Sequence, residues 1–259
     1  MITDTWVRGR RTEYEMALKE ELERSGERLF RWRSYPPLLF FGVVLWGMRD
    51  FSYPRGSHVL DGVWEVLCLV PVVLGCALRM WAIGTAAPNT SGGNRSGQIA
   101  EDLNTTGAYS MVRHPLYLGV LLIWTGVAMV PRSLGVVLLI WLLFWVYYER
   151  IMIAEESFLS RKFGAAYDAW SSRTPAIIPR LRAYERSRYP FSMRMALRRE
   201  YSAWLAAATP LFVLEMYGDY VIHGRVIVDR TWLAGFIVVV VVAASVRALK
   251  HYTRVLRTR

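Results

Sequence analysis

Two short stretches of this chain combine residue types that bind small charged molecules. In the first, TTGAYSMVRHPLYLG, Arg113 and His114 directly precede Pro115, which suits the first position of a helix. We therefore expect His114 at the N-cap, beside unpaired backbone N–H groups and the positive end of the helix dipole, where a carboxylate or phosphate can bind. Tyr117 and Gly119 follow on the first turn, as an aromatic wall and a point of close backbone approach. Taken alone, such a motif is more often an anchor at a membrane boundary.

The second stretch, ERIMIAEESFLSRKFGAAYDAWSSRTPAIIP, carries an acidic doublet. Arg150, Glu155 and Glu156 fall within two turns of one helix, and Gly164 is well placed to end that helix. Acidic residues at a boundary can simply be solvated, but charges held at membrane depth are costly and indicate a functional site.

Aromatic and basic residues continue this stretch. Tyr167 and Trp170 lie three residues apart on one helical face, and Arg173 precedes two prolines. Tyr and Trp at such a place are more often an interfacial face than part of a ligand site.

The composition predicts the kind of scaffold that positions these residues. Of 259 residues, 54% are hydrophobic and 11 are Trp, which is typical of a membrane protein. The net charge of +11 could suggest nucleic acid, but no recognition motif accompanies it, so we expect no nucleic-acid partner. We predict an all-α polytopic bundle, embedded in the lipid bilayer, with about six spans and a cytosolic cofactor-binding segment. The expected spans are 35–48, 60–83, 115–130, 134–148, 204–217 and 231–246, of which the third and fourth form a tight hairpin reaching into the cytosol.

The basic residues predict the orientation in the membrane. With six spans, 27 Lys and Arg fall on the side of the termini and 5 on the other side. Cytoplasmic loops collect basic residues, so both termini and the active segment are expected in the cytosol. We divide the chain into an N-terminal interfacial helix (1–34), two spans with a polar loop (35–104), a core (105–182), and an interfacial helix with two spans (183–259). Within the last part, 180–199 is expected to be a surface helix on anionic lipid.

The combined motifs resemble the isoprenylcysteine carboxyl methyltransferase and phospholipid methyltransferase superfamily. They are R-H-P-x-Y-x-G at the head of a hairpin, then a Glu pair and F-G-x-x-Y-x-x-W with two later prolines, over residues 105–179. The resemblance implies S-adenosylmethionine as cofactor and a lipid substrate. It places the cofactor carboxylate at His114, and its amino group or ribose at Glu155 or Glu156. The wider cofactor site is Arg113, His114, Pro115, Tyr117, Gly119, Glu155 and Glu156.

The acceptor side is assigned to arginines and to a polar loop. Arg150 and Arg173 are expected to face the acceptor and, with Glu155, to act in catalysis, and Asn89 and Arg95 are further substrate-binding candidates. That loop and the two C-terminal spans resemble a bacterial branch that methylates a phosphate of lipid A, which implies the bacterial inner membrane. No metal site is expected, and the oligomeric state is left open.

Chemistry favours an anionic acceptor. A phosphate or carboxylate is already ionised at neutral pH, whereas an amine must lose a proton, which Glu155 or Glu156 could accept. Arginines near the motifs favour the anion. The alternatives are a phospholipid amine N-methyltransferase, an NADPH-dependent membrane sterol-type reductase and a non-enzymatic membrane scaffold.

Overall fold

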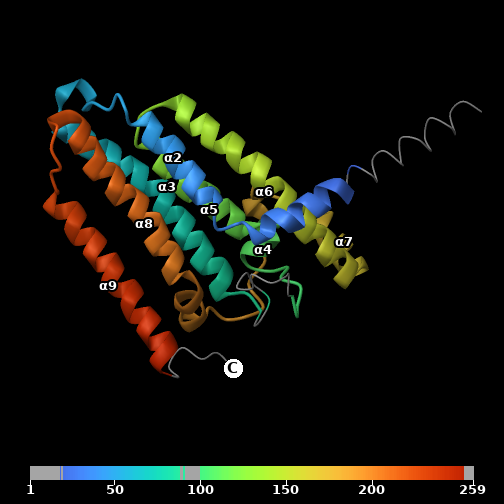
Figure 1. Ribbon diagram of the computed structural model, residues 1–259. Helices are drawn as coiled ribbons and strands as arrows, with labels where there is room; N and C mark the ends of the chain where they lie inside the picture. Colours follow the sequence, from blue (N-terminus) through green and yellow to red (C-terminus); the bar gives the residue numbers. More distant parts are fainter. Residues whose placement is uncertain (1–17, 19, 88–89, 91–99, 254–259) are drawn as a thin grey trace, which may run out of the picture.

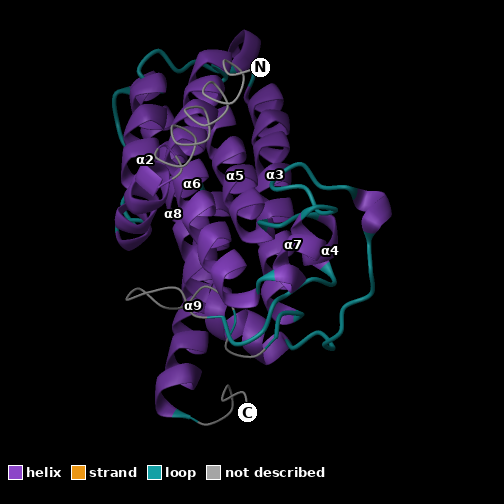
Figure 2. Ribbon diagram, turned by 90° about the vertical axis from the view of Figure 1, so that its right-hand side faces the viewer, coloured by secondary structure: helices purple, strands orange, loops and turns teal. Residues whose placement is uncertain are grey.

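The protein is a bundle of helices. The computed structural model describes residues 18, 20–87, 90 and 100–253, and all its regular elements there are helical (Figures 1 and 2). Residues 20–31 form a helix, followed by α2 (Pro36–Gly47), η1 (Pro54–Gly56), α3 (His58–Gly84), α4 (Ala108–Met111), α5 (Pro115–Met129), α6 (Leu134–Phe163), α7 (Ala165–Ser171), η2 (Leu181–Ala183), α8 (Met193–His223) and α9 (Arg230–Tyr252). Within this part of the chain, α3, α6, α8 and α9 are long and apolar enough to cross a membrane, and α2 and α5 are shorter apolar helices. The predicted polytopic all-α fold is confirmed.

Side-chain caps mark where the long helices begin. Ser57, Ser133 and Ser192 each accept a hydrogen bond from the backbone N–H three residues later, at the starts of α3, α6 and α8. Asp229 accepts two such bonds at the start of α9, at 2.7 and 3.0 Å. Each cap satisfies helix N–H groups that have no partner within the helix.

α6 joins the predicted fourth span and the acidic stretch after it in one helix. The predicted span ended at residue 148, but the helix runs for 30 residues to Phe163 without a break. No proline or glycine interrupts it after Gly135, and the polar residues from Glu149 onward are good helix formers. It ends at Gly164, whose φ of 51° and ψ of −128° disfavour any side chain, so the predicted helix end is confirmed. α6 therefore carries the acidic doublet beyond the apolar part of the bundle.

α3 and α5 pack through glycines. A Cβ added to Gly75 would lie 2.5 Å from the carbonyl oxygen of Gly119, and one added to Gly126 would collide with the backbone of Cys68. Helices in lipid associate by close van der Waals fit, which small residues allow. Gly119 was predicted as a point of close approach to a cofactor, but its close neighbour is α3.

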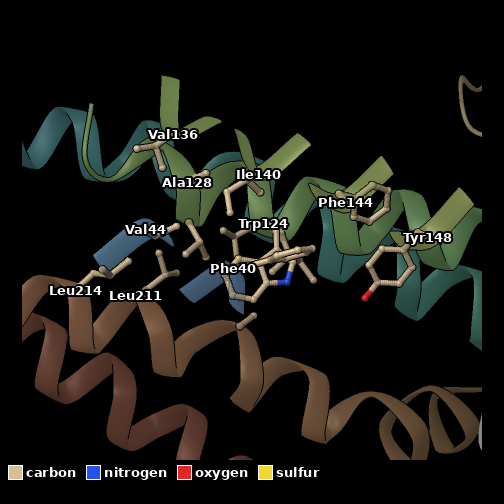
Figure 3. Close-up of a cluster of buried hydrophobic side chains, with 14 of the residues drawn as sticks. Phe40, Val44, Trp124, Ala128, Val136, Ile140, Phe144, Tyr148, Leu211 and Leu214 are labelled. Carbon is tan, nitrogen blue, oxygen red and sulfur yellow. The ribbon is translucent and has the colours of Figure 1, made fainter. Parts of the chain in front are cut away.

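The apolar core joins α2, α5, α6 and α8, as Figure 3 shows. Phe40 of α2 meets Trp124 of α5 edge to face, with ring centroids 5.3 Å apart. Such pairs add roughly 0.5–1.5 kcal/mol beyond the buried area. α8 and α9 run side by side along one edge of the bundle (Figure 1), where Phe212 stacks on Phe236 at 4.5 Å. The core fixes α5 against α6, the two helices that carry the chemical motifs.

The end of the bundle at which α5 ends and α6 begins is closed by polar contacts. Arg132 has a positive φ of 57° in the turn between these helices, and its guanidinium bonds to Asp61 and to a backbone carbonyl. Tyr53 donates to Asp219 of α8 at 2.9 Å. These contacts lie at the opposite end of the bundle from the start of α5, so they are separate from the chemical motifs.

The predicted surface helix over 180–199 is wrong. Residues 172–192, here called the connecting segment, hold only the short turn η2, and α8 starts at Met193. The N–H of Ser192 donates to Gly84 at 2.7 Å, and the N–H of Glu185 donates to the Ser110 hydroxyl at 2.9 Å. Its N–H groups therefore bond to α3 and α4, and Pro179 and Pro190 disfavour a helix, so the segment stays non-helical except at η2. Of the N-terminal interfacial helix expected over 1–34, residues 1–17 and 19 lie outside the described residues.

Candidate active site

The start of α5 is held by backbone bonds to the connecting segment. His114 occupies the N-cap, as predicted, but its side chain makes no capping bond. The N–H of Arg113 donates to the carbonyl of Pro175 at 2.8 Å, and the N–H of His114 donates to that of Ala176 at 3.1 Å. Pro115 is the first helical residue, as the motif indicated. The imidazole of His114 is therefore not used to cap the helix, and the backbone of this residue is held by its bond to the connecting segment.

Glu156 of α6 binds both basic residues of the motif. Its Oε1 lies 2.8 Å from Nε2 of His114, and its Oε2 lies 2.6 Å from Nη1 of Arg113. His114 is buried, whereas the side chain of Glu156 is 26% exposed. Charge-assisted bonds of this length are strong, so Glu156 connects α6 to the start of α5.

Glu155 is the less engaged member of the doublet. Its Oε2 lies 3.9 Å from Nδ1 of His114, which is too long for a hydrogen bond, and its side chain is 35% exposed. The imidazole thus stands between two carboxylates, bonded to Glu156 and only near Glu155. Of the two acids, Glu155 has the carboxylate with more freedom to meet a ligand.

Aromatic rings border the charged cluster, by which we mean Arg113, His114, Glu155 and Glu156. Tyr117 lies 5.6 Å from the His114 ring and 5.4 Å from Tyr148 of α6, which stacks on Phe144 at 4.4 Å. Tyr117 is only partly buried. The charged cluster is therefore bordered by a row of rings that reaches into the apolar core (Figure 3).

Tyr167 and Trp170 of α7 belong to this site and not to an interfacial surface. Both are buried, and the indole N–H of Trp170 donates to the carbonyl of Tyr109 at 3.0 Å. The buried hydroxyl of Tyr167 makes no hydrogen bond to the described residues. Burial, together with the nearby charge of Glu156, raises the pKa of Tyr167 to about 12. An unbonded buried hydroxyl is a group that a ligand can satisfy.

Arg150 and Arg173 do not join the cluster. The side chain of Arg150 is exposed, and on an ideal helix it points roughly 140° away from Glu155. Gly26, on the helix 20–31, packs on the backbone of Arg150. Arg173 is exposed on the connecting segment. Asn89 and Arg95 lie outside the described residues, so the roles of these four residues stay predictions.

Sequence reasoning missed a buried ion pair next to this site. Arg79 of α3 binds Glu200 of α8 with two bonds, at 2.7 and 2.8 Å. The available signal was a single arginine in an otherwise apolar stretch, because a charge there needs a partner. The partner could not be found from sequence, since it lies 121 residues away.

Comparison with known proteins assigns these helices to a family. Residues 64–166, which include most of α3, all of α5 and α6, and Glu155 and Glu156, match the family model of phospholipid methyltransferases. This part of the chain is similar to phospholipid methyltransferases, and we call residues 64–166 the methyltransferase core. This core covers both ends of the charged cluster, while the connecting segment after residue 171, α8 and α9 lie beyond it.

Three curated relatives match parts of the chain. Protein-S-isoprenylcysteine O-methyltransferase of Schizosaccharomyces pombe is 32% identical over 77 residues, 30% of this chain and 33% of the relative. The cobalt-zinc-cadmium resistance protein CzcN of Cupriavidus metallidurans is 33% identical over 134 residues, 50% of this chain and 57% of the relative. The nickel-cobalt-cadmium resistance protein NccN of Alcaligenes xylosoxydans xylosoxydans is 37% identical over 86 residues, 33% of this chain and 40% of the relative. The chain thus spans between about a third and three fifths of these relatives, and the family match together with the yeast enzyme confirms the predicted superfamily.

No solved structure matches the chain. Among the residues that the structure describes, no group of three or more His, Cys, Asp or Glu side chains is placed to hold a metal ion.

Proposed function

We propose that this protein is an integral membrane methyltransferase that transfers the methyl group of S-adenosylmethionine to a phosphate or carboxylate of a lipid. The observation that carries the proposal is the cluster in which His114 lies between Glu155 and Glu156. It joins the two motifs across 41 residues of sequence, inside the methyltransferase core. On the charge count of the loops, we place this end of the bundle in the cytosol, and in a bacterial host this would be the inner membrane.

The residues present fit the cofactor. The half-exposed carboxylate of Glu155 is suited to the ammonium group, and Arg113 and the second nitrogen of His114 are suited to the carboxylate. Tyr117 offers a ring face, and the unbonded Tyr167 hydroxyl offers a donor. When bound, S-adenosylmethionine supplies an electrophilic methyl group, which an acceptor lone pair takes as the carbon–sulfur bond breaks and its electron pair stays on sulfur.

The chain's own part in such a transfer is positioning. An in-line displacement needs the acceptor atom opposite the leaving sulfur, and orientation of this kind can lower a barrier by several kcal/mol, about 7–11 at best. In our assignment Glu156 holds Arg113 and His114 in place, and Glu155 contacts the ligand. This separates the two acids, whose roles the motif alone left open.

Exposed arginines on the connecting segment support an anionic acceptor. Arg173, Arg180 and Arg182 are exposed there, and the segment bonds to the start of α5 through Pro175 and Ala176. Arg113 is bonded to Glu156, so it contributes less to this argument than its position in the motif suggested. Arginine pairs well with phosphate and carboxylate oxygens. A phosphate of lipid A is one acceptor of this class.

The chemical stability of the product tests the acceptor. Purified protein is incubated with S-adenosylmethionine labelled in the methyl group and with extracted membrane lipids. We expect label either in lipid that releases it as methanol in base, as a carboxylate methyl ester does, or in base-stable lipid that mass spectrometry identifies as an O-methyl phosphate. Label found only in base-stable N-methylated lipid would reject the anionic acceptor and favour the amine alternative.

Cofactor choice separates the remaining alternatives. A ligand that binds only the folded protein raises its melting temperature. We expect stabilisation by S-adenosylmethionine and none by NADPH. Stabilisation by NADPH alone would favour a reductase, and stabilisation by neither, with no label transferred, would favour a scaffold.

A further inference from the structure

A buried ion pair joins three helices beside the candidate active site. Glu200 of α8 is 2% exposed, and its two oxygens bind Nε and Nη2 of Arg79 at 2.7 and 2.8 Å. The remaining guanidinium nitrogen of Arg79 donates to the carbonyl of Leu116 in the first turn of α5, at 3.2 Å. Each nitrogen of the guanidinium therefore has a partner, and the three partners fix its orientation.

The first turn of α5 is held by this pair on one side and by the charged cluster on the other. Leu116 lies between His114 and Tyr117, two residues assigned to the cofactor site. The stem of Arg79 packs on Gly119, where an added Cβ would lie 3.0 Å from Cδ of Arg79 and closer still to Cγ. Glu156 binds the same turn from α6 through His114. A shift of Arg79 would therefore be transmitted to the turn that carries His114.

Stability alone is a poor explanation for this pair. Taking two charges out of water costs several kcal/mol, and replacing a buried ion pair by apolar residues of similar size is often neutral or stabilising. A two-bond pair between arginine and a carboxylate does supply a fixed geometry. The ion pair then serves to orient α5 and not to stabilise the fold.

We propose that Arg79 and Glu200 are positioning residues for methyl transfer. Glu200 orients the Arg79 guanidinium, and Arg79 holds the first turn of α5, which presents His114 and Tyr117. This inference rests on the proposed function. Glu200 lies on α8, outside residues 64–166. On this inference α8 therefore supplies a positioning residue to the methyltransferase core although the family model does not match it.

The matched test uses two buried acids of the same helix. Glu200→Gln keeps the shape but places an amide N–H against a guanidinium N–H. Asp219→Asn likewise turns a buried carboxylate into an amide at the opposite end of α8, where Asp219 accepts a hydrogen bond from the Tyr53 hydroxyl and has no arginine partner in the described residues. We expect Glu200→Gln to lower kcat/KM for S-adenosylmethionine about tenfold to a hundredfold, since small displacements cost that much. Asp219→Asn should leave it within about twofold. The double variant Arg79→Met with Glu200→Leu should retain the melting temperature and still lose activity.

Hydrogen exchange reports the positioning without relying on activity. The Leu118 amide bonds to the His114 carbonyl at 3.0 Å, so its exchange measures the order of the first turn of α5. We expect faster exchange there in Glu200→Gln and none of this change in Asp219→Asn. Unchanged exchange, or changed exchange with normal kinetics, would overturn the inference. If the unmodified protein transfers no methyl group to any lipid fraction, the proposed function fails and the catalytic role fails with it, even where exchange responds.

Discussion

Replacing each acid of the doublet by its amide should separate their roles. Glu156→Gln puts an amide N–H against either Arg113 or His114 and so removes one of two short bonds. Glu155→Gln breaks no short ion pair, because its nearest cationic partner lies 3.9 Å away, and its amide oxygen can still accept from the Tyr117 hydroxyl beside it. The first change should therefore lower the stability of the protein, whereas the second should weaken only ligand binding.

The magnitudes follow from the bonds lost. A hydrogen bond to a charged group contributes about 1.5–3 kcal/mol. The side chains of Arg113 and Glu156 are 21% and 26% exposed, so solvent screening reduces this to about 1–2 kcal/mol. For a chain of this size that corresponds to a fall in Tm of about 2–8 °C. Glu155→Gln should leave Tm unchanged, but it should raise KM for S-adenosylmethionine tenfold or more if its carboxylate meets the ammonium group.

Melting curves and initial rates on the same purified samples measure both effects. Glu149→Gln is the control, since Glu149 is an exposed acid on the same helix and should change neither quantity. An equal loss of Tm in Glu155→Gln and Glu156→Gln would refute the division of roles. So would a Glu156→Gln protein with normal Tm and normal kinetics.

Three further predictions concern single side chains around α5. His114→Ala should lower methyl transfer about a hundredfold or more in the radiolabel assay while the protein still inserts and folds, and normal turnover would remove His114 from the site. Gly119→Ala should lower the free energy of unfolding by about 1–3 kcal/mol because its Cβ collides with Arg79, whereas Gly62→Ala, where nothing lies within 4 Å, should cost nothing in the same denaturation experiment. Tyr167→Phe should leave Tm unchanged or higher at neutral pH, because the hydroxyl is unbonded. Since the Tyr167 pKa is raised to about 12 from about 10, its titration leaves stability unchanged below pH 10 and lowers it as the pH rises towards 12, so Tyr167→Phe should weaken the alkaline fall in stability seen by circular dichroism.

The local features of the site could be predicted because they depend on neighbouring residues. Pro115 after His114 predicts a helix start, and Gly164 predicts a helix end, since both effects act on the adjacent backbone. The six apolar segments follow from their composition. The expected helix at 180–199 failed because backbone N–H groups of this segment bond to the distant helices α3 and α4, a competition that a local pattern does not contain.

What the amino-acid sequence determined by itself is the class of the molecule: a basic, apolar, helical membrane protein with two motifs of one methyltransferase superfamily. The tertiary structure alone decided which charges meet. It bonded Glu156 and left Glu155 half exposed, turned Arg150 away, and paired Arg79 with Glu200. The physical reason is range: helix periodicity and capping act over a few residues, whereas ion pairing depends on how whole helices pack across the bundle.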